Sequence, residues 1–573
     1  MDKLTNNANQ ILRNRYLLRD HKGNIIETIA QLFNRVAKFV ATAENKNKSA
    51  WENRFFQVMN RLEFLPNSPT LMNAGTPNGQ LSACFVLPIN DSLESIFTTL
   101  KHAALIHQSG GGTGFNFSAL RPKNDMVTSL GGTSSGPIAF MKIFDTATEN
   151  VKQGGKRRGA NMGILNINHP DIESFISSKS DKNGLQNFNI SVGITDNFMM
   201  AVKHNRYWNL INPRNLKVIK KIKASYLWQC ITEEAWKTGD PGLIFLDTIN
   251  KHNPTPKLGD IKSTNPCGEV PLLDFESCNL GSINLSKMLL ENERETVVNW
   301  TKLQGIIHLG IRFLDNIITL NYYLLPEIES VTKTNRKIGL GIMGWAEMLF
   351  MLEIPYASKE ALTLAEKLMK FIQNESYIAS TNLAIEKGQF YELENSMHYL
   401  NMKLRNATCN SIAPTGSISV IANTSYSIEP LFALAYKRVG VLENKTQIEI
   451  NKTFIKKIKQ FGYWNKEIEN CLYTKGTIKD VKSLPDDIKK IFETSLEIPW
   501  NYHLLHQKAF QKYTDNAVSK TINLPKKTTI KEISEIYWTA WTYKLKGITI
   551  YRNGSRDKQV LQKCNFTTTN DCQ

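Results

Sequence analysis

Long apolar runs are missing from this chain of 573 residues. Its first sixteen residues hold no apolar stretch of signal-peptide length, and no run of about 18 apolar residues occurs elsewhere, so we expect a cytoplasmic protein without membrane contact. Cysteine is scarce as well. Eight cysteines are too few for a disulfide scaffold in so long a chain, and we expect them to stay reduced unless turnover oxidises them.

Internal repeats and low-complexity linkers are also absent, which favours one large core with appendages over a string of independent domains. The hydrophobic content of 41% is enough for such a core. The net charge of +18 raises the question of nucleic acid, but the lysines are scattered through a sequence rich in Asn, Lys and Ile. Scattered charge indicates a compositional bias, and nucleic-acid binding is not expected.

Three regions differ in their patterns. Residues 1–64 include apolar positions at helical spacing, which predicts a small helical region with a packing role. Residues 65–556 contain short apolar runs broken by Gly, Pro, Asn and Ser and separated by helical stretches, which is typical of an α/β domain. Within it, residues 439–532 are lysine-rich and mostly helical in pattern. Residues 557–573 form a polar tail with no packing pattern.

Three cysteines carry the strongest chemical signal. Cys267 lies in NPCGE between Asn265 and Glu269, and a cysteine between a carboxamide and a carboxylate is a candidate radical or nucleophilic centre. Cys278 follows eleven residues later, and Cys84 lies far upstream. Two such thiols supply a pair of electrons when they close a disulfide. The combination points to reductive chemistry.

The glycine-rich segments favour different interpretations. GLGIMG at 339–344 has the spacing of a dinucleotide-binding turn, but no apolar strand precedes it, and tight helix packing is the favoured interpretation. The segment QSGGGTGFNFSALRP at 108–122 fits a ligand-contacting loop as well as a plain turn. In NSIAPTGSISVIAN a strand, a turn and a helix start are expected. That turn is either an anion site or a simple N-cap made by Ser417.

Nine segments occur in an order and spacing that resemble the ribonucleotide reductases. They cover the chain from about Arg15 to Arg556, and the resemblance is strongest to the adenosylcobalamin-dependent class II enzymes. The segments are NSPTLMNAG, SACFVLP, GGGTGFNFSALRP, KQGGKRRGANMG, NPCGE, ESCNLGSINL, RKIGLGIMGWAEML, APTGSIS and GITIYRNGSR.

This resemblance implies a ten-stranded α/β barrel with a central finger loop, and it implies roles for five residues. Cys267 would carry the thiyl radical that abstracts the 3′ hydrogen of the substrate. Glu269 would act as general base on the 3′ hydroxyl, and Asn265 would hydrogen-bond the ribose hydroxyls. Cys84 and Cys278 would become a disulfide in each turnover. The residues expected to contact the substrate are Ser68, Ala83, Cys84, Gly112, Asn265, Pro266, Cys267, Gly268, Glu269, Pro414, Thr415, Gly416, Ser417 and Ile418.

The radical source follows from two missing features. The tyrosine pair expected in a class I large subunit is replaced by Ile550 and Tyr551, and no glycyl-radical motif is present. This leaves adenosylcobalamin, bound close to Cys267, as the expected cofactor. No cobalt-ligating D-x-H-x-x-G segment and no other metal-ligating site is expected. The alternatives are a class I large subunit served by a partner subunit, and a nucleotide-binding regulator that has lost a chemical residue; the second is disfavoured because all five are present.

The same resemblance implies partners. The substrate is expected to be a ribonucleoside diphosphate, with the triphosphate as an open alternative. A deoxynucleotide effector is expected at a homodimer interface, and its candidate contacts are Asp145, Lys152, Gln153, Lys156 and Arg157. No ATP-cone activity switch is expected, because the N-terminal region is short. Thioredoxin or glutaredoxin would restore the active-site thiols through a tail that here retains Cys564 and Cys572, while Asn553 departs from the usual aspartate.

Overall fold

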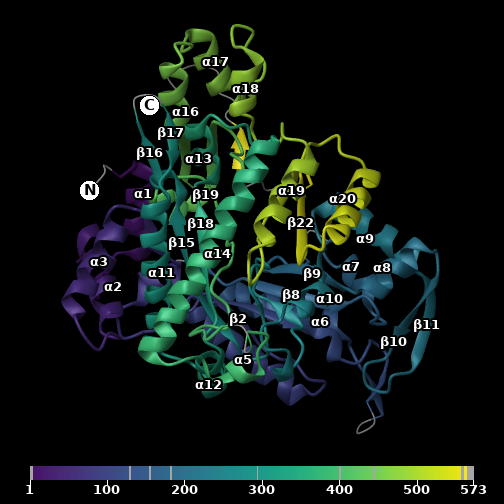
Figure 1. Cartoon of the computed structure of the whole chain (residues 1–573). Helices are drawn as coiled ribbons and strands as arrows, with labels where there is room; N and C mark the ends of the chain where they lie inside the picture. Colours follow the sequence, from purple (N-terminus) through teal and green to yellow (C-terminus); the bar gives the residue numbers. More distant parts are fainter. Residues whose placement is uncertain are drawn as a thin grey trace.

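The computed structural model describes residues 4–127, 131–153, 157–180, 184–292, 295–398, 400, 402–442, 445–555 and 561–563. Seen from the side in Figure 1, helices surround a central sheet, and α16, α17 and α18 form a separate lobe at the top. Within the described ranges, no helix is both long enough and apolar enough to cross a bilayer.

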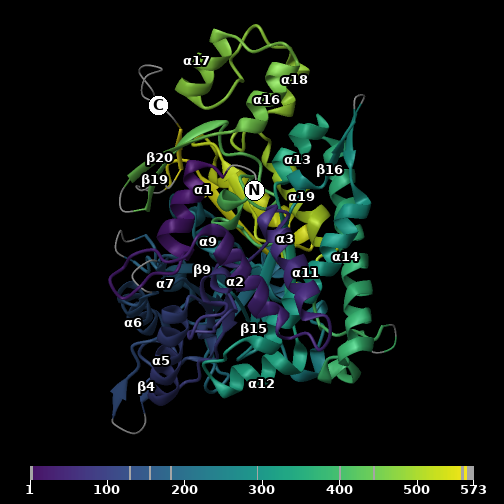
Figure 2. The same ribbon diagram turned by 90° about the vertical axis from the view of Figure 1, so that its left-hand side faces the viewer.

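The N-terminal region is helical, as its apolar spacing predicts. A capping box between Thr28 and Gln31 starts the second α-helix, and the buried positions of that helix include Leu32, Phe33 and Val36. Their spacing of one, three and four residues places them on one face, which packs into the same core as α11. Figure 2 shows the N-terminal helices α1, α2 and α3 on the face turned toward the viewer, over α11. The elements are α1 (Asn6–Ile11), the π-helical turn η1 (Leu12–Tyr16), α2 (Ile29–Ala41), α3 (Lys48–Asn60) and α11 (Trp300–Leu320).

The central sheet contains two sets of parallel strands. The first set runs in one direction and consists of β2 (Cys84–Val86), β3 (Gly112–Asn116), β8 (Asn161–Asn166), β9 (Phe188–Ile194) and β12 (Gly242–Phe245). The second set runs the opposite way and consists of β15 (Ser277–Asn284), β18 (Ile338–Met343), β21 (Thr521–Leu524) and β22 (Gly547–Arg552). The short β1 (Phe64–Pro66) pairs with β15 from outside this arrangement.

The two sets join into a closed barrel. On one side β2 pairs antiparallel with β15, and on the other β12 pairs antiparallel with β22. Segment 408–412 fills the remaining gap between β18 and β21. Its Asn410 forms a β-bridge with Leu340 of β18, and its Ile412 forms one with Val518, just before β21. In the described part of the chain, the barrel therefore has ten strands. Nine are the paired strands other than β1, and the tenth is segment 408–412. The expected ten-stranded α/β barrel is confirmed.

GLGIMG does not adopt the helix-packing turn that the sequence favoured. Its first five residues lie in the buried strand β18, and the helix begins after Gly344. A Cβ on Gly341 would lie 2.3 Å from the carbonyl oxygen of Ser411, and one on Gly339 would lie 2.4 Å from Leu280. These glycines therefore allow neighbouring strands to approach closely, and no dinucleotide-binding turn is formed.

A hairpin enters the barrel and forms the expected finger loop. It consists of β13 (Ser263–Thr264) and β14 (Pro271–Leu272), with residues 265–270 at its tip. A Cβ on Gly114 would lie 1.7 Å from the carbonyl oxygen of Thr264, so only glycine lets this strand pass the finger. From other parts of the barrel, Asn189 donates to the carbonyl of Pro266 at 2.8 Å, and the backbone of Ala517 donates to the carbonyl of Glu269 at 2.9 Å. The tip is thus held from several sides.

Further helices and hairpins cover the barrel or project from it. The segment at 439–532 contains the end of β19, then β20 and four helices, and after these it supplies β21 to the barrel and begins α20. The helices are α4 (Ser68–Asn73), α5 (Leu93–Ser109), α6 (Pro137–Asn150), α7 (Ile172–Ile176), α8 (Asp196–Lys203), α9 (Ala224–Thr238), α10 (Leu246–Lys251), α12 (Pro326–Asn335), α13 (Trp345–Leu352), α14 (Lys359–Lys387), α15 (Ile418–Ile421), α16 (Lys452–Gln460), α17 (Lys466–Lys475), α18 (Asp486–Ile491), α19 (Trp500–Gln511) and α20 (Ile530–Thr542). The peripheral strands are β4 (Met126–Val127), β5 (Gly132–Thr133), β6 (Lys152–Gln153), β7 (Arg157–Arg158), β10 (Tyr207–Ile211), β11 (Val218–Lys223), β16 (Leu289–Glu291), β17 (Thr296–Val298), β19 (Ala435–Leu442), β20 (Lys445–Ile450) and β23 (Leu561–Lys563).

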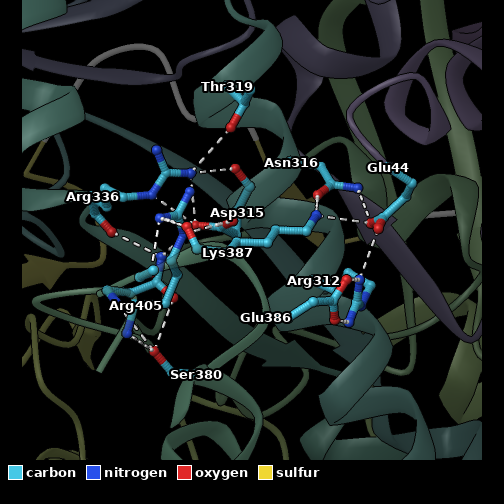
Figure 3. A network of polar contacts seen from close by, with 12 residues as sticks. Glu44, Arg312, Asp315, Asn316, Thr319, Arg336, Ser380, Glu386, Lys387 and Arg405 are labelled. Atoms are coloured by element: carbon cyan, nitrogen blue, oxygen red, sulfur yellow. Dashed lines mark hydrogen bonds and ion pairs between the residues drawn. The ribbon is translucent and has the colours of Figure 1, made fainter. Parts of the chain in front are cut away.

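A buried polar network fixes the N-terminal region to the barrel helices (Figure 3). Glu44, which follows α2, accepts from Arg312 of α11 at 2.8 Å and forms an ion pair with Lys387 of α14 at 3.1 Å. Asn316 donates to the same carboxylate at 2.7 Å. Because Glu44 is almost wholly buried, these partners replace the water it has lost.

Candidate functional site

The finger tip presents Cys267 between two cavities. The tip turns where the N–H of Gly268 bonds the carbonyl of Asn265 at 3.1 Å, and Gly268 has a φ of +80°, which favours glycine. Cys267 is exposed and lines both cavities, a smaller one of about 340 Å³ and a larger one of about 690 Å³. A thiol in this position can exchange a hydrogen atom or an electron with a group on either side.

The smaller cavity collects the predicted substrate contacts. It is bounded by β2, β3, the finger tip and the turn at 414–418, which come from separate parts of the sequence. Gly268 is the exception, because it lines the larger cavity. The predicted residues around the smaller cavity are Ser68, Ala83, Cys84, Gly112, Asn265, Pro266, Cys267, Glu269, Pro414, Thr415, Gly416, Ser417 and Ile418.

Cys84 and Cys278 are register partners in the antiparallel pair of β2 and β15. Cys84 lines the smaller cavity, whereas Cys278 lies behind it and is not among the described residues that line either cavity. Burial raises the pKa of both thiols well above the usual value, and the nearby Glu269 raises that of Cys84 further. Both are therefore protonated at neutral pH, which suits the donation of hydrogen in place of nucleophilic attack.

Asn265 and Glu269 frame the thiols. The side chain of Asn265 donates to the sulfur of Cys84 at 3.2 Å, and its oxygen accepts from the backbone of Val270 at 3.0 Å. Glu269 is buried, and burial raises its pKa to about 7 despite a hydrogen bond from Asn265 that lowers it. Its Oε2 has no hydrogen-bond partner among the described residues. A buried carboxylate oxygen in this state is ready to accept a hydrogen bond from a ligand hydroxyl.

The turn at 414–418 departs from a simple N-cap. Ser417 makes no side-chain capping bond, so the N-cap interpretation is wrong, and α15 is only four residues long. Thr415 has a φ of +58°, and its hydroxyl accepts from the backbone of Ser427 at 2.8 Å, which holds the turn. Two residues of the N-terminal region reach the same wall: Arg15 donates to the hydroxyl of Ser417 at 3.4 Å, and the Tyr16 hydroxyl lies 2.8 Å from that of Ser68.

Sequence reasoning missed His107, which also lines the smaller cavity. Its Nε2 lies 2.9 Å from the hydroxyl of Thr113, and that hydroxyl donates to the amide oxygen of Asn161 at 2.8 Å. Thr113 must therefore accept from His107, which fixes the proton on Nε2 and leaves a lone pair on Nδ1. Burial lowers the pKa of His107 to about 4, so the ring is neutral. A single histidine in the last turn of a helix gave no motif to find it by.

The other cavity residues lie in the segments that carry the family resemblance, although the sequence assigned none of them a role. A Cβ on Gly159 would lie 2.8 Å from the His107 ring, so the chain passes directly against the imidazole. The remaining lining residues that the sequence did not single out are Asn67, Pro69, Gly110, Gly111, Ala160, Leu280, Gly281, Ser282 and Ala413.

The predicted effector contacts lie away from the substrate residues. Asp145, on α6, accepts from the backbone of Asn187 at 2.7 Å. Lys152, Gln153 and Arg157 belong to the paired strands β6 and β7, and the chain enters the smaller cavity at Gly159 and Ala160. Lys156, Cys564 and Cys572 lie outside the described residues. No group of three or more His, Cys, Asp or Glu in the described chain could hold a metal ion.

Comparison with known proteins agrees with this architecture. Residues 82–403 and 401–551 match the barrel domain of ribonucleotide reductase, and residues 2–79 match its all-alpha domain. These matches cover most of the sequence, and the chain belongs to the ribonucleotide reductase family.

Individual relatives indicate the class of ribonucleotide reductase that this chain resembles most. A vitamin B12-dependent ribonucleoside-diphosphate reductase of Thermoplasma acidophilum is 47% identical, over 98% of this chain and 80% of that protein. One of Mycobacterium tuberculosis is 46% identical, over 98% of this chain and 81% of that protein. Among solved structures, the class Id ribonucleotide reductase alpha subunit of Actinobacillus ureae has a TM-score of 0.80 at 24% identity, over 97% and 98% of the two chains, which shows a shared fold. The family prediction is confirmed, and the predicted class II assignment agrees with the names of the two relatives.

Proposed function

We propose that this protein reduces ribonucleoside diphosphates to 2′-deoxyribonucleotides in the cytoplasm, using adenosylcobalamin to initiate radical chemistry at Cys267. The observation that carries the proposal is the convergence of Cys84, Asn265, Cys267 and Glu269 on one cavity, with Cys278 opposite Cys84 on the neighbouring strand. The names of the two bacterial and archaeal relatives support the diphosphate substrate and the cofactor.

The larger cavity fits a bulky cofactor beside Cys267. Its walls come from β9, β12, β21 and β22 and consist mainly of backbone, apolar and uncharged polar groups, among them Asn523, Thr549, Ile550 and Tyr551. Hydroxyl and amide groups of this kind suit the amide-bearing rim of a corrin. When bound, adenosylcobalamin supplies a carbon-centred radical through homolysis of its cobalt–carbon bond. Cys267, exposed to this cavity, gives up its thiol hydrogen and holds the resulting radical inside the barrel.

Reduction then takes place in the smaller cavity. The sulfur radical of Cys267 takes the 3′ hydrogen, and Glu269 takes the 3′ hydroxyl proton while Asn265 holds the ribose. The C2′–O bond breaks and the oxygen leaves as water after protonation. Cys84 and Cys278 supply two electrons and two hydrogens as their sulfur–sulfur bond forms. Cys267 returns the 3′ hydrogen, so the net change is one ribonucleotide and two thiols to one deoxyribonucleotide, one disulfide and water.

A homodimer and an effector site complete the proposal. Four apolar side chains are exposed on α5 and α6: Leu93, Phe97, Leu105 and Ile143. An apolar surface on two neighbouring helices suits helix packing between two copies of this chain. Asp145 lies on the same α6, the paired strands β6 and β7 follow α6 in the chain, and Gly159 just after β7 lines the smaller cavity. A deoxynucleotide bound near Asp145 would thus act on substrate choice, and thioredoxin or glutaredoxin would restore the thiols.

One assay tests the proposal. The purified chain is incubated with a ribonucleoside diphosphate and dithiothreitol, with and without adenosylcobalamin, and deoxynucleotide is quantified. Product should require adenosylcobalamin and no second protein, and Cys267→Ser should abolish it while nucleotide binding persists. Reduction that is independent of adenosylcobalamin and requires a partner subunit would contradict the cofactor assignment and favour a class I large subunit. Turnover by Cys267→Ser above background would disprove the radical role of that thiol.

A further inference from the structure

The described lining of the smaller cavity includes no cationic side chain for a negatively charged substrate. No lysine or arginine is among the described residues that line it, and its titratable side chains are Cys84, His107, Cys267 and Glu269. His107 is neutral near pH 7, because burial lowers its pKa to about 4. A nucleoside diphosphate carries several negative charges, and a positive side chain close to the phosphates strengthens its binding.

Arg15 brings a positive charge to the edge of this cavity. Its Nη1 donates to the hydroxyl of Ser417 at 3.4 Å, and Ser417 lines both cavities. The next residue, Tyr16, lies 2.8 Å from the hydroxyl of Ser68 on the same cavity wall. Both come from the π-helical turn η1, a type of turn that is frequent at functional sites. The N-terminal region, for which the sequence predicted only packing, therefore contributes to the substrate wall.

A second cation, Lys520, also lines the larger cavity. Lys520 is fully buried, forms an ion pair with Glu429 and donates to Nδ1 of His503 at 3.1 Å and to the carbonyl of Thr521 at 3.2 Å. An ammonium group has three donors, and these three contacts use them all. Arg15 lines the same cavity and donates to Ser417, which places its positive charge beside the turn at 414–418.

We propose that Arg15 is a specificity-determining residue that binds the terminal phosphate of the substrate at the turn of residues 414–418. The inference rests on the proposed function, because it takes the nucleotide phosphates to lie at that turn. A phosphate oxygen bonded to the Ser417 hydroxyl lies within reach of the guanidinium group, whose forked donors match phosphate geometry. The four-residue α15 has too short a dipole to hold such a charge alone.

The test compares Arg15→Gln with Arg13→Gln. Arg13 is an exposed arginine of the same η1 turn and does not line either cavity, so its variant is a matched control for loss of charge. With CDP as substrate, Arg15→Gln should raise KM by about 10- to 100-fold, the range of one or two charge-assisted hydrogen bonds, and leave kcat within about two-fold. Arg13→Gln should change neither constant, and Arg15→Lys should recover part of the lost affinity.

Equilibrium binding separates a phosphate role from a structural one. By calorimetry, wild-type protein should bind CDP more tightly than cytidine, and Arg15→Gln should lose that advantage while its affinity for cytidine stays the same. An unchanged preference for CDP would overturn the inference. Equal weakening of CDP and cytidine would also overturn it, because it would mean that Arg15 only supports the fold.

The phosphate group of the cobalamin nucleotide tail is the other source of the same chemistry, since the cavity that Arg15 lines is the larger one. A titration with hydroxocobalamin, followed by its visible absorbance, distinguishes the two. Arg15→Gln should leave this affinity unchanged, and a loss confined to hydroxocobalamin would overturn the substrate role. If the whole proposed function were wrong, the result would differ from each of these outcomes. Wild-type protein would then bind CDP but form no deoxynucleotide.

Discussion

Cys84 lies directly opposite Cys278 across the antiparallel strands β2 and β15. Opposed residues in such a pair have Cα atoms about 4.5–5.5 Å apart, which falls within the range of about 4.4–6.8 Å found for disulfides. The two thiols can therefore be joined without separation of the strands. We expect that pre-reduced protein, given substrate and cofactor but no external reductant, forms this disulfide in proportion to product. Peptide mapping without reduction measures it.

Two variants serve as controls for this measurement. Cys278→Ser should give no sustained product, because one of the two electron donors is missing. Cys409→Ser, a change at a buried cysteine that does not line either cavity, should keep both product and disulfide. A disulfide that links Cys84 to another partner during turnover would contradict the assigned pair.

Glu269 should control the pH dependence of activity. Its pKa is raised to about 7 by burial, and the base must be ionised to take a proton from the 3′ hydroxyl. The value of kcat/KM should therefore rise with pH through about 7 and level off above it. Glu269→Gln should lower kcat/KM by about 100-fold or more and remove this rise. A wild-type profile that is flat between pH 6 and 8 would argue against Glu269 as the base.

The same group should make stability depend on pH in the opposite sense. The folded protein binds this proton more tightly than the unfolded chain, in which the pKa is about 4.3. Its stabilising contribution is complete below that value and is lost as the pH rises through about 7. Relative to Glu269→Gln, the wild-type protein should lose about 2–3 kcal/mol of unfolding free energy between pH 5 and pH 8. Urea unfolding of both proteins at the two pH values measures this difference.

The reactive residues could be predicted from sequence because they occupy short motifs with unusual neighbours, as Cys267 does in NPCGE. Their assembly could not be derived from composition or periodicity. Cys84 meets Cys278 only because β15 closes the barrel against β2, a long-range pairing that the family resemblance supplied. The fold was thus predicted from the family resemblance, and the reductive chemistry from the local motifs.

The sequence misled where a residue's role depends on its neighbours in space. Gly339 and Gly341 were expected to serve helix packing, but they lie in strand β18, where segment 408–412 and Leu280 press against them. Arg15 and Tyr16 belong to the N-terminal region, for which the sequence predicted packing alone, yet they contact Ser417 and Ser68. Nothing in a one-dimensional pattern distinguishes an arginine on a helix surface from one at a cavity edge.

Gly159 should tolerate no side chain. A Cβ there would lie 2.8 Å from the His107 ring and 2.9 Å from Thr148, and both of these side chains are buried. Gly159→Ala should shift the cavity wall and raise KM for the substrate by about 10-fold, with a smaller effect on kcat. Gly305→Ala is the control, because that position on α11 has no atom within 4 Å of the added Cβ. It should leave KM unchanged and stabilise the helix by up to about 1 kcal/mol.

Arg312 links a buried and an exposed carboxylate, which allows a matched test of how the N-terminal region is held (Figure 3). It bonds Glu44, of which 1% of the side chain is exposed, and Glu386, of which 48% is exposed. Glu44→Gln removes the buried charge that faces both Arg312 and Lys387, and it should cost about 3 kcal/mol of unfolding free energy. Glu386→Gln removes a solvated partner of the same arginine and should cost less than about 1 kcal/mol.

Chemical denaturation of the two variants measures both costs, and limited proteolysis shows where the loss occurs. Because Glu44 follows α2 while its partners lie on α11 and α14, cleavage in Glu44→Gln should appear first within the N-terminal helices. Since Arg15 and Tyr16 approach the smaller cavity from this region, the same variant should also raise KM for CDP under conditions in which the barrel stays folded. Equal costs for the two substitutions would mean that burial of Glu44 adds nothing to its ion pairs, and an unchanged KM would mean that the N-terminal helices hold their place without it.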